Sequence, residues 1–133
     1  MSSIPIGARG SFQLVVAAEH LANRFKDATL PAVLATPVMI LLMENAALNA
    51  IKPYLAPGQT ALGTRVDVMH LAATPIGRTV IAEAEVTGVD GRRIELTVRA
   101  FDGAEQIGAG THQRTLIDLD RFNEQLKAKS ATG

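Results

Sequence analysis

The stretch TPVMILLMENAALNAIKPYL, residues 36–55, is predicted to form a long helix that is almost wholly apolar. Thr36 offers a hydroxyl that can cap a helix, and Pro37 is suited to the first helical turn. Pro53 disfavours helical geometry in the residue before it, so the helix should end near Lys52. Because this helix is apolar nearly all round, the rest of the protein must enclose it.

The segment before this helix is predicted to be a strand followed by a long loop. Residues 10–20 are rich in strand-forming residues, with Phe12 and Leu14 on the same face as Val16. Residues 21–35 are mixed in character, and we expect a loop with a turn of helix, long enough to act as a lid.

After the long helix the sequence changes to the alternating pattern of half-buried strands. Asp90-Gly91 and Asp102-Gly103 are tight hairpin signals between such segments. Asp118 then should cap a short terminal helix, which we expect to fray from residue 127 onward. Four strands in a meander are expected, over residues 60–72, 78–89, 92–101 and 105–117.

This order of elements predicts an α+β fold, with a curved antiparallel sheet wrapped around one long central helix. We expect residues 1–133 to form a single domain, since the chain has no repeat and no internal linker. One sheet covers only one side of a helix. A second subunit is therefore the expected cover for its other side.

Composition excludes several classes of protein. The apolar fraction of 47% is far from that of disordered chains, and 13 basic and 13 acidic residues give no basic surface for nucleic acid or an anionic membrane. Cysteine is absent, which excludes disulfides and thiolate metal sites. The first ten residues lack signal-peptide features, and no apolar run reaches the ~20 residues of a membrane span. We expect a cytoplasmic protein.

Glu44 lies in the middle of the apolar helix. On a helical wheel Ile40, Leu41 and Leu48 fall within ~60° of it, inside the apolar stripe. A carboxylate in such a place needs a partner, water or a ligand, because an unpaired buried charge is costly. A purely structural carboxylate bonded to backbone N–H groups is the alternative.

His70 and Thr36 are the candidate partners of Glu44. His70 shares a strand face with Val66 and Val68, which should look at the helix, and pairing with Glu44 would make it an acid–base unit rather than a core histidine. Thr36 lies ~12 Å from Glu44 along the helix axis, so an imidazole or a substrate group fits between them. The N–H groups at the helix N-terminus could stabilise an oxyanion, as acyl transfer requires.

The element order and the motifs TP…MENAAL, VMHLAATPIG and GAGTHQR resemble a hotdog-fold thioesterase of the fluoroacetyl-CoA thioesterase-like branch, over residues 10–118. Thr36, Glu44 and His70 match the catalytic set of that branch. The resemblance implies hydrolysis of short-chain acyl-CoA thioesters, substituted or not, with coenzyme A as part of the substrate and no separate cofactor. It also implies a homodimer with sites near the subunit interface, and leaves a tetramer open.

The resemblance gives each of these residues a role. Glu44 would be base or nucleophile, His70 its acid–base partner, and Thr36 a nucleophile or a substrate-positioning hydroxyl. Gly63 matches a glycine whose backbone approaches the acyl group. In the last strand, His112 and Arg114 fit the THxR pattern of the branch. Arg114 would bind substrate, or both residues would serve only the structure.

One departure from the branch concerns the lid. The fluoroacetate specialist has an aromatic lid over its pocket, whereas residues 21–35 offer only Phe25 beside Leu30 and Val33. We therefore expect an enzyme for generic small acyl groups, and the sequence leaves the acyl group open.

Two other functions are compatible with the same fold. A non-catalytic hotdog protein would bind an acyl-CoA or a small carboxylate without cleaving a thioester. An enoyl-CoA hydratase is less well supported, because its paired Asp and His are not visible. No metal site is expected, since His20, His70 and His112 are scattered without ligand spacing.

Overall fold

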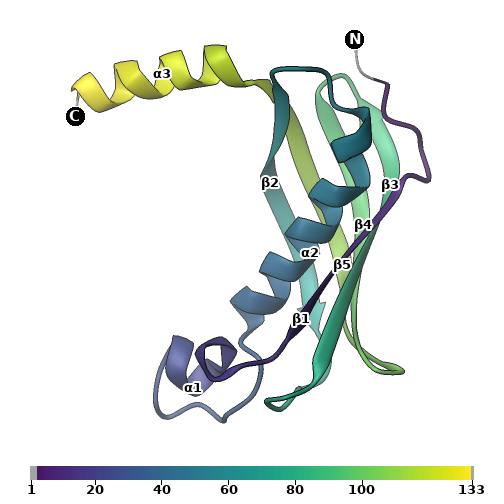
Figure 1. Cartoon of the computed structure of the whole chain (residues 1–133), viewed down its shortest axis with the longest axis vertical. Helices are drawn as coiled ribbons and strands as arrows, with labels where there is room; N and C mark the ends of the chain where they lie inside the picture. Colours follow the sequence, from purple (N-terminus) through teal and green to yellow (C-terminus); the bar gives the residue numbers. More distant parts are fainter. Residues whose placement is uncertain (1–2, 133) are drawn as a thin grey trace.

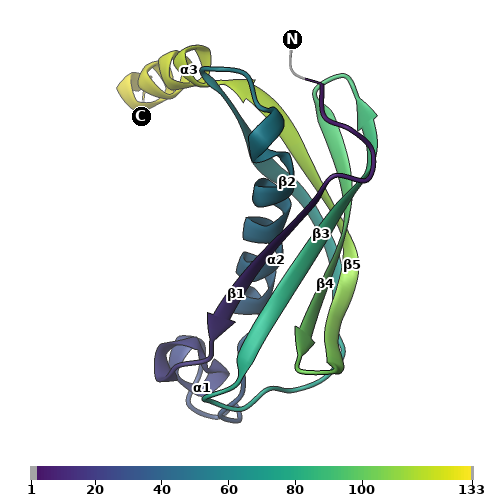
Figure 2. The same cartoon turned by 45° about the vertical axis from the view of Figure 1, so that its right-hand side comes forward.

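The computed structural model of the chain describes residues 3–132 and has the α+β architecture expected from the sequence. A five-stranded antiparallel sheet, in the order β1-β3-β4-β5-β2, curves around one side of the long helix α2 (Figures 1 and 2). The strands are β1 (Arg9–Val15), β2 (Gln59–His70), β3 (Thr79–Asp90), β4 (Arg93–Asp102) and β5 (Glu105–Asp118), and the helices are α1 (Ala22–Phe25), α2 (Thr36–Ile51) and α3 (Leu119–Thr132).

The core lies between α2 and the concave face of the sheet. Alternate residues of β3 and β4 point inward, as their sequence period of two predicts, while one face of α2 supplies the opposite wall. Burial of these apolar side chains is the main favourable contribution to folding. The buried residues on the two sides include Met39, Leu42, Met43, Ala46, Val80, Ala82, Val86, Ile94, Leu96 and Val98.

Gly10 allows β1 to lie directly against α2. A Cβ atom on Gly10 would collide with the backbone carbonyl of Ala46 and the backbone amide of Ala50. The approach of the two backbones leaves no room for any side chain at this position.

Strand β1 is also shorter than predicted, because residues Ala18–His20 form a short 3-10 helix instead of continuing it.

The helix α2 has the predicted bounds but not the predicted cap. It starts at Thr36 and ends at Ile51, before a turn of 3-10 helix that contains Pro53. Its N-cap is Ala35, and no side chain caps the first turn. The prediction that the Thr36 hydroxyl caps the helix is wrong, because this hydroxyl contacts His70 instead.

Strand β2 is the second element that differs from prediction. The meander expected from the two hairpins holds for β3, β4 and β5, and Gly91 and Gly103 take the positive φ angles of 61° and 59° that such turns need. β2 was predicted to be the first strand of that meander, beside β3, but it lies on the far side of β5 and pairs with that strand. It therefore forms one edge of the sheet, while β1 forms the other.

Helix α3 projects away from the sheet at the end opposite α1 (Figures 1 and 2). As predicted, the Asp118 carboxylate accepts a hydrogen bond from the Arg121 N–H at 3.0 Å. The helix is longer than the short one predicted, since α3 continues to Thr132, beyond residue 127 where the sequence was expected to fray. Residues 124–128, EQLKA, are all good helix formers, which accounts for the longer helix.

Within residues 3–132, no helix combines the length and the apolar character needed to span a membrane.

Replacing Gly10 by alanine should lower the free energy of unfolding by about 1–3 kcal/mol, because the new methyl group must push β1 off the backbone of α2. Urea unfolding of the two proteins measures this difference. Gly88→Ala is the matched control on β3, where a Cβ would meet only the Glu95 side chain at 3.5 Å. Similar losses in the two variants would contradict this account of the α2–β1 contact.

Candidate active site

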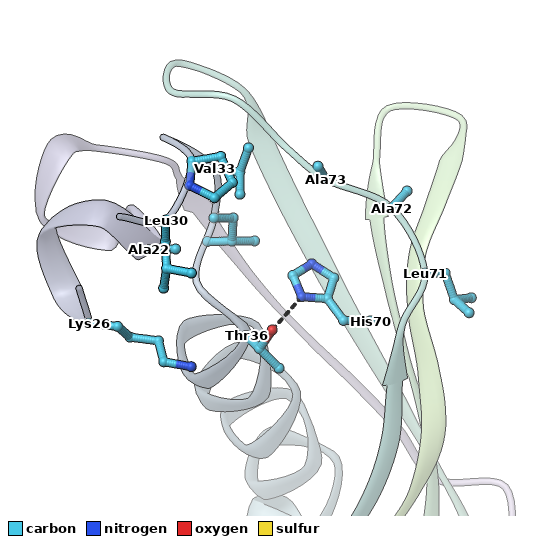
Figure 3. Close-up of a pocket in the computed structure, with 11 residues that line it drawn as sticks. Ala22, Lys26, Leu30, Val33, Thr36, His70, Leu71, Ala72 and Ala73 are labelled. Carbon is cyan, nitrogen blue, oxygen red and sulfur yellow. Dashed lines mark hydrogen bonds between the residues drawn. The ribbon is translucent and has the colours of Figure 1, made fainter. Parts of the chain in front are cut away.

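A cavity of about 440 Å³ lies where the N-terminus of α2, the end of β2 and the segment around α1 meet (Figure 3). Three separate parts of the chain therefore build its wall. Apart from Lys26, Thr36 and His70, its lining is apolar, formed by Ala22, Leu30, Pro31, Val33, Leu34, Leu71, Ala72 and Ala73. Such a site, mainly apolar with a few convergent polar groups, is typical of small-molecule binding.

Thr36 and His70 are joined by a hydrogen bond in this cavity. The distance between the Thr36 Oγ1 and the His70 Nδ1 is 2.7 Å (Figure 3). Thr36 is the first residue of α2 and His70 is the last residue of β2, so the contact depends on how the helix is seated against the sheet. Two residues that are 34 positions apart in the sequence thus form one polar unit.

The imidazole of His70 is held in its neutral form. Burial lowers its pKa below the ordinary value of 6.5, and the backbone of Ala72 opposes this shift only in part. Its Nε2 is buried and has no hydrogen-bond partner in the part of the chain that the structure describes. In the tautomer with the proton on Nε2, the Nδ1 is free to accept the proton of the Thr36 hydroxyl.

Glu44 lies two turns further along α2, in a second polar cluster. A Cβ atom on Gly63 would come within 2.5 Å of the Glu44 Oε2, so this carboxylate occupies the space that a side chain on β2 would fill. Arg114 reaches the same place from β5. Its Nη2 donates to the Ala61 carbonyl at 2.7 Å and its Nη1 to the Glu44 carbonyl at 3.4 Å.

His112 fixes the position of Arg114. The His112 ring is only 2% exposed, its Nδ1–H donates to the Arg65 carbonyl at 2.8 Å, and its Nε2 accepts from the Arg114 Nη1 at 3.2 Å. Both ring nitrogens are therefore used, and the tautomer is set by its contacts.

The charges in this second cluster oppose one another. Burial lowers the pKa of His112, and the neighbouring Arg114 lowers it further, while the Arg65 carbonyl and Glu44 act in the opposite direction. Burial also lowers the pKa of Arg114, opposed by Glu44. His112 thus stays neutral beside a guanidinium, and Glu44 is the anion that balances that charge.

The predicted site residues therefore fall into two groups. Thr36 and His70 come together, whereas Glu44 lies with Gly63 and Arg114. No direct contact of Glu44 with His70 occurs among the described residues of a single chain. The bond between His112 and Arg114 was not anticipated, although their spacing of two on one strand places both side chains on the same face.

The N-terminus of α2 offers fewer N–H groups than expected. Pro37 has none, and the N–H groups of Val38 and Met39 both donate to the Ala35 carbonyl. Within residues 3–132, the Thr36 N–H has no acceptor, so it remains available at the positive end of the helix.

The described residues contain no cluster of three or more His, Asp or Glu side chains arranged to hold a metal ion.

Comparison with known proteins gives one family for most of the chain. The model of the family FlK, fluoroacetyl-CoA-specific thioesterase, matches residues 16–120. A fluoroacetyl-CoA thioesterase from Streptantibioticus cattleyicolor is 47% identical over 106 residues, which cover 80% of this chain and 76% of that protein.

Solved structures give the same result. A structure of the fluoroacetyl-CoA thioesterase FlK superposes with a TM-score of 0.88 at 40% identity, covering 96% of this chain and 98% of that one. A Thermus thermophilus protein described as a thioesterase superfamily member superposes with a TM-score of 0.89 at 28% identity, and the match covers 100% of both chains.

The neutral state of His112 should make the stability of the fold depend on pH. Its pKa is lower in the folded chain than the 6.5 of the unfolded chain, so below pH 6.5 the unfolded state binds the proton first. The contribution of neutral His112 to the free energy of unfolding is complete above pH 6.5. It is lost as the pH falls, by at most about 1.4 kcal/mol per pH unit. His70 contributes in the same direction.

Urea unfolding of the wild type and His112→Gln, measured between pH 5 and pH 8, tests this linkage. Glutamine can still donate to Arg65 and accept from Arg114, but it does not titrate. The variant should show a shallower fall in stability on the acid side. Equal slopes would mean that folding does not lower the pKa of His112.

Proposed function

This chain belongs to the FlK family of fluoroacetyl-CoA-specific thioesterases and has the hotdog fold, and we propose that it hydrolyses short-chain acyl-CoA thioesters with Thr36 and His70 as the reacting pair. The family, the fold and the class of enzyme, a thioester hydrolase acting on acyl-CoA, were predicted from the sequence and are confirmed. The roles of individual residues, the acyl group and the assembly are proposals.

The hydrogen bond of 2.7 Å between Thr36 and His70 carries this assignment of roles. A hydroxyl bonded to a neutral imidazole, inside a cavity, is the arrangement of an activated nucleophile and its base. The Thr36 Oγ1 attacks the acyl carbon and gives its proton to the His70 Nδ1. The bond between carbon and sulfur then breaks, and the same proton passes to the coenzyme A thiolate.

The second half of the reaction uses the same groups. A water molecule gives a proton to His70 and its oxygen bonds to the acyl carbon of the Thr36 ester. The proton then returns to the Thr36 oxygen as the carboxylic acid leaves, so both side chains recover their starting state. In each half the Thr36 N–H, at the positive end of α2, is the group best placed to stabilise the developing oxyanion.

Two features support the proposal of a homodimer. The edge strand β2 exposes large apolar side chains, with Val66 40%, Met69 67% and Leu62 39% accessible. On α2, Leu41 is 52% exposed, one turn before Glu44. A long apolar edge strand beside an uncovered apolar helix face favours pairing with a second copy.

Pairing of β2 with its copy would also unite the two polar clusters. A two-fold axis at this edge makes the two β2 strands antiparallel, so the Gly63 end of one strand approaches the His70 end of the other. We therefore propose that Glu44, Gly63 and Arg114 of the partner subunit complete the site of Thr36 and His70. The Glu44 carboxylate would then orient the attacking water, and the backbone of Gly63 would approach the acyl group.

The lining of the lid segment supports a generic short acyl group rather than selection for fluorine. Leu30 and Val33 line the cavity, whereas Phe25 is 54% exposed and does not. The wall that faces the acyl group from this segment is therefore aliphatic. A cytoplasmic location, a single domain over residues 1–133 and a tetramer stay predictions.

Removing either member of the reacting pair should abolish most of the thioesterase activity. Thr36→Ala and His70→Gln should each lower kcat for acetyl-CoA or propionyl-CoA by about 10²-fold or more, while Thr36→Ser keeps a hydroxyl and much of the rate. Release of the coenzyme A thiol measures these rates.

In the wild type, kcat/KM should fall on the acid side only at a pH below 6.5. The base, His70, must be neutral to accept the proton, and its pKa is lowered.

Thr97→Ala, on the outer face of β4, is the control for these substitutions and should leave kcat unchanged. Full activity of Thr36→Ala with normal folding would remove Thr36 as nucleophile. Unchanged activity of His70→Gln would remove the proposed base.

Mixed dimers test whether the site is shared between subunits. His70→Gln and Glu44→Gln should each be poorly active alone. A mixed dimer, isolated with two different affinity tags, would combine one intact site with one doubly altered site and should show about half the wild-type kcat. If Glu44 acts within its own chain, the mixed dimer will be as inactive as its parents.

A further inference from the structure

Of the three polar side chains that line the cavity, Thr36 and His70 take part in the proposed reaction and Lys26 does not. It comes from the turn that ends α1, and among the side chains that line the cavity it is the only one with a cationic head group. Figure 3 shows its side chain extending from α1 toward Thr36, with its nitrogen on that side of the cavity. The cation therefore lies on the same side of the molecule as the reacting hydroxyl.

The ammonium of Lys26 has no anionic partner in the part of the chain that the structure describes. The adjacent carboxylate, Asp27, is occupied by Thr29, whose N–H and hydroxyl both donate to its Oδ1, at 2.9 Å and 2.7 Å. These bonds also lower the pKa of Asp27. A lone cation at the mouth of an otherwise apolar cavity is complementary to a ligand with an apolar middle and an anionic end.

The position of Lys26 restricts which anion of an acyl-CoA it can meet. Its side chain lines the same cavity as Thr36 and His70, so its partner must lie in that cavity when the thioester carbonyl is at Thr36. The phosphates of coenzyme A are separated from the thioester by the long pantetheine arm. A carboxylate at the far end of a short acyl chain is close enough to the carbonyl to share the cavity with it.

We propose that Lys26 selects acyl-CoA thioesters whose short acyl chain ends in a carboxylate, the mono-CoA esters of small dicarboxylic acids. This inference rests on the proposed function and names its substrate class. Leu30 and Val33 contact the methylene groups of the acyl chain, and Lys26 forms an ion pair with its free carboxylate. The ion pair is formed with the substrate and not with the reacting atoms, so Lys26 determines specificity rather than catalysis.

The test compares succinyl-CoA with butyryl-CoA, whose acyl chains have equal length and differ in the terminal carboxylate. The wild type should have the higher kcat/KM on succinyl-CoA. Lys26→Gln should lower kcat/KM on succinyl-CoA by roughly three- to fivefold, the effect of one exposed charged contact, and leave butyryl-CoA nearly unchanged. Lys26→Arg keeps the charge and should keep most of the preference.

Arg24→Gln is the matched control, because Arg24 lies on α1, two residues before Lys26, but does not line the cavity. This substitution should leave kcat/KM unchanged for both substrates. The same pair of acyl groups on N-acetylcysteamine, which lacks the phosphates, separates the two anions of the substrate, and the preference for the succinyl ester should persist there.

Three results would overturn the inference. If Lys26→Gln weakens both CoA esters equally and neither N-acetylcysteamine ester, its ammonium binds a coenzyme A phosphate. If it changes neither ester, the cation is only a solvated side chain. Hydrolysis of butyryl-CoA in these cases leaves the proposed function intact, whereas no thiol release from any ester by the wild type overturns both.

Discussion

The structure depends on the seating of α2 in the concave face of the sheet. Close contact at Gly10 and the interlocking residues of β3 and β4 fix the helix on that side. The position of the helix sets where its polar residues lie, because Thr36 and Glu44 are rigidly spaced along it. The contacts of Thr36 with His70 and of the Glu44 carbonyl with Arg114 both follow from this packing arrangement.

The two polar clusters of the candidate site differ in their chemistry. Near the α2 N-terminus a half-buried, neutral imidazole faces a hydroxyl, which suits proton transfer near neutral pH. Further along, the buried guanidinium of Arg114 is locked between His112 and two backbone carbonyls. Breaking such a network by removing one partner leaves a buried charge uncompensated, so the second cluster is as much a structural element as a candidate substrate contact.

Much of this architecture was predictable from residue patterns. The alternation along residues 78–101, the two Asp-Gly turns and the start of α2 at Thr36 all have local causes, and each was predicted correctly. The edge position of β2 was not, because strand order depends on long-range pairing and not on local period. The same limit applies to Glu44 and His70: both were recognised as unusual, but their separation within one chain depends on the tilt of the helix over the sheet.

The missing side-chain cap of α2 has an energetic consequence. A hydroxyl or carboxylate at an N-cap stabilises a helix by about 1 kcal/mol, and here the position is held by Ala35, which is only 1% exposed, while the adjacent hydroxyl is directed into the cavity. The first turn of α2 is therefore less well secured than its sequence allows. In the proposed reaction the Thr36 hydroxyl serves the cavity and not the helix, so a cap for this turn would have to come from a polar side chain at position 35, in the space where Ala35 is now buried.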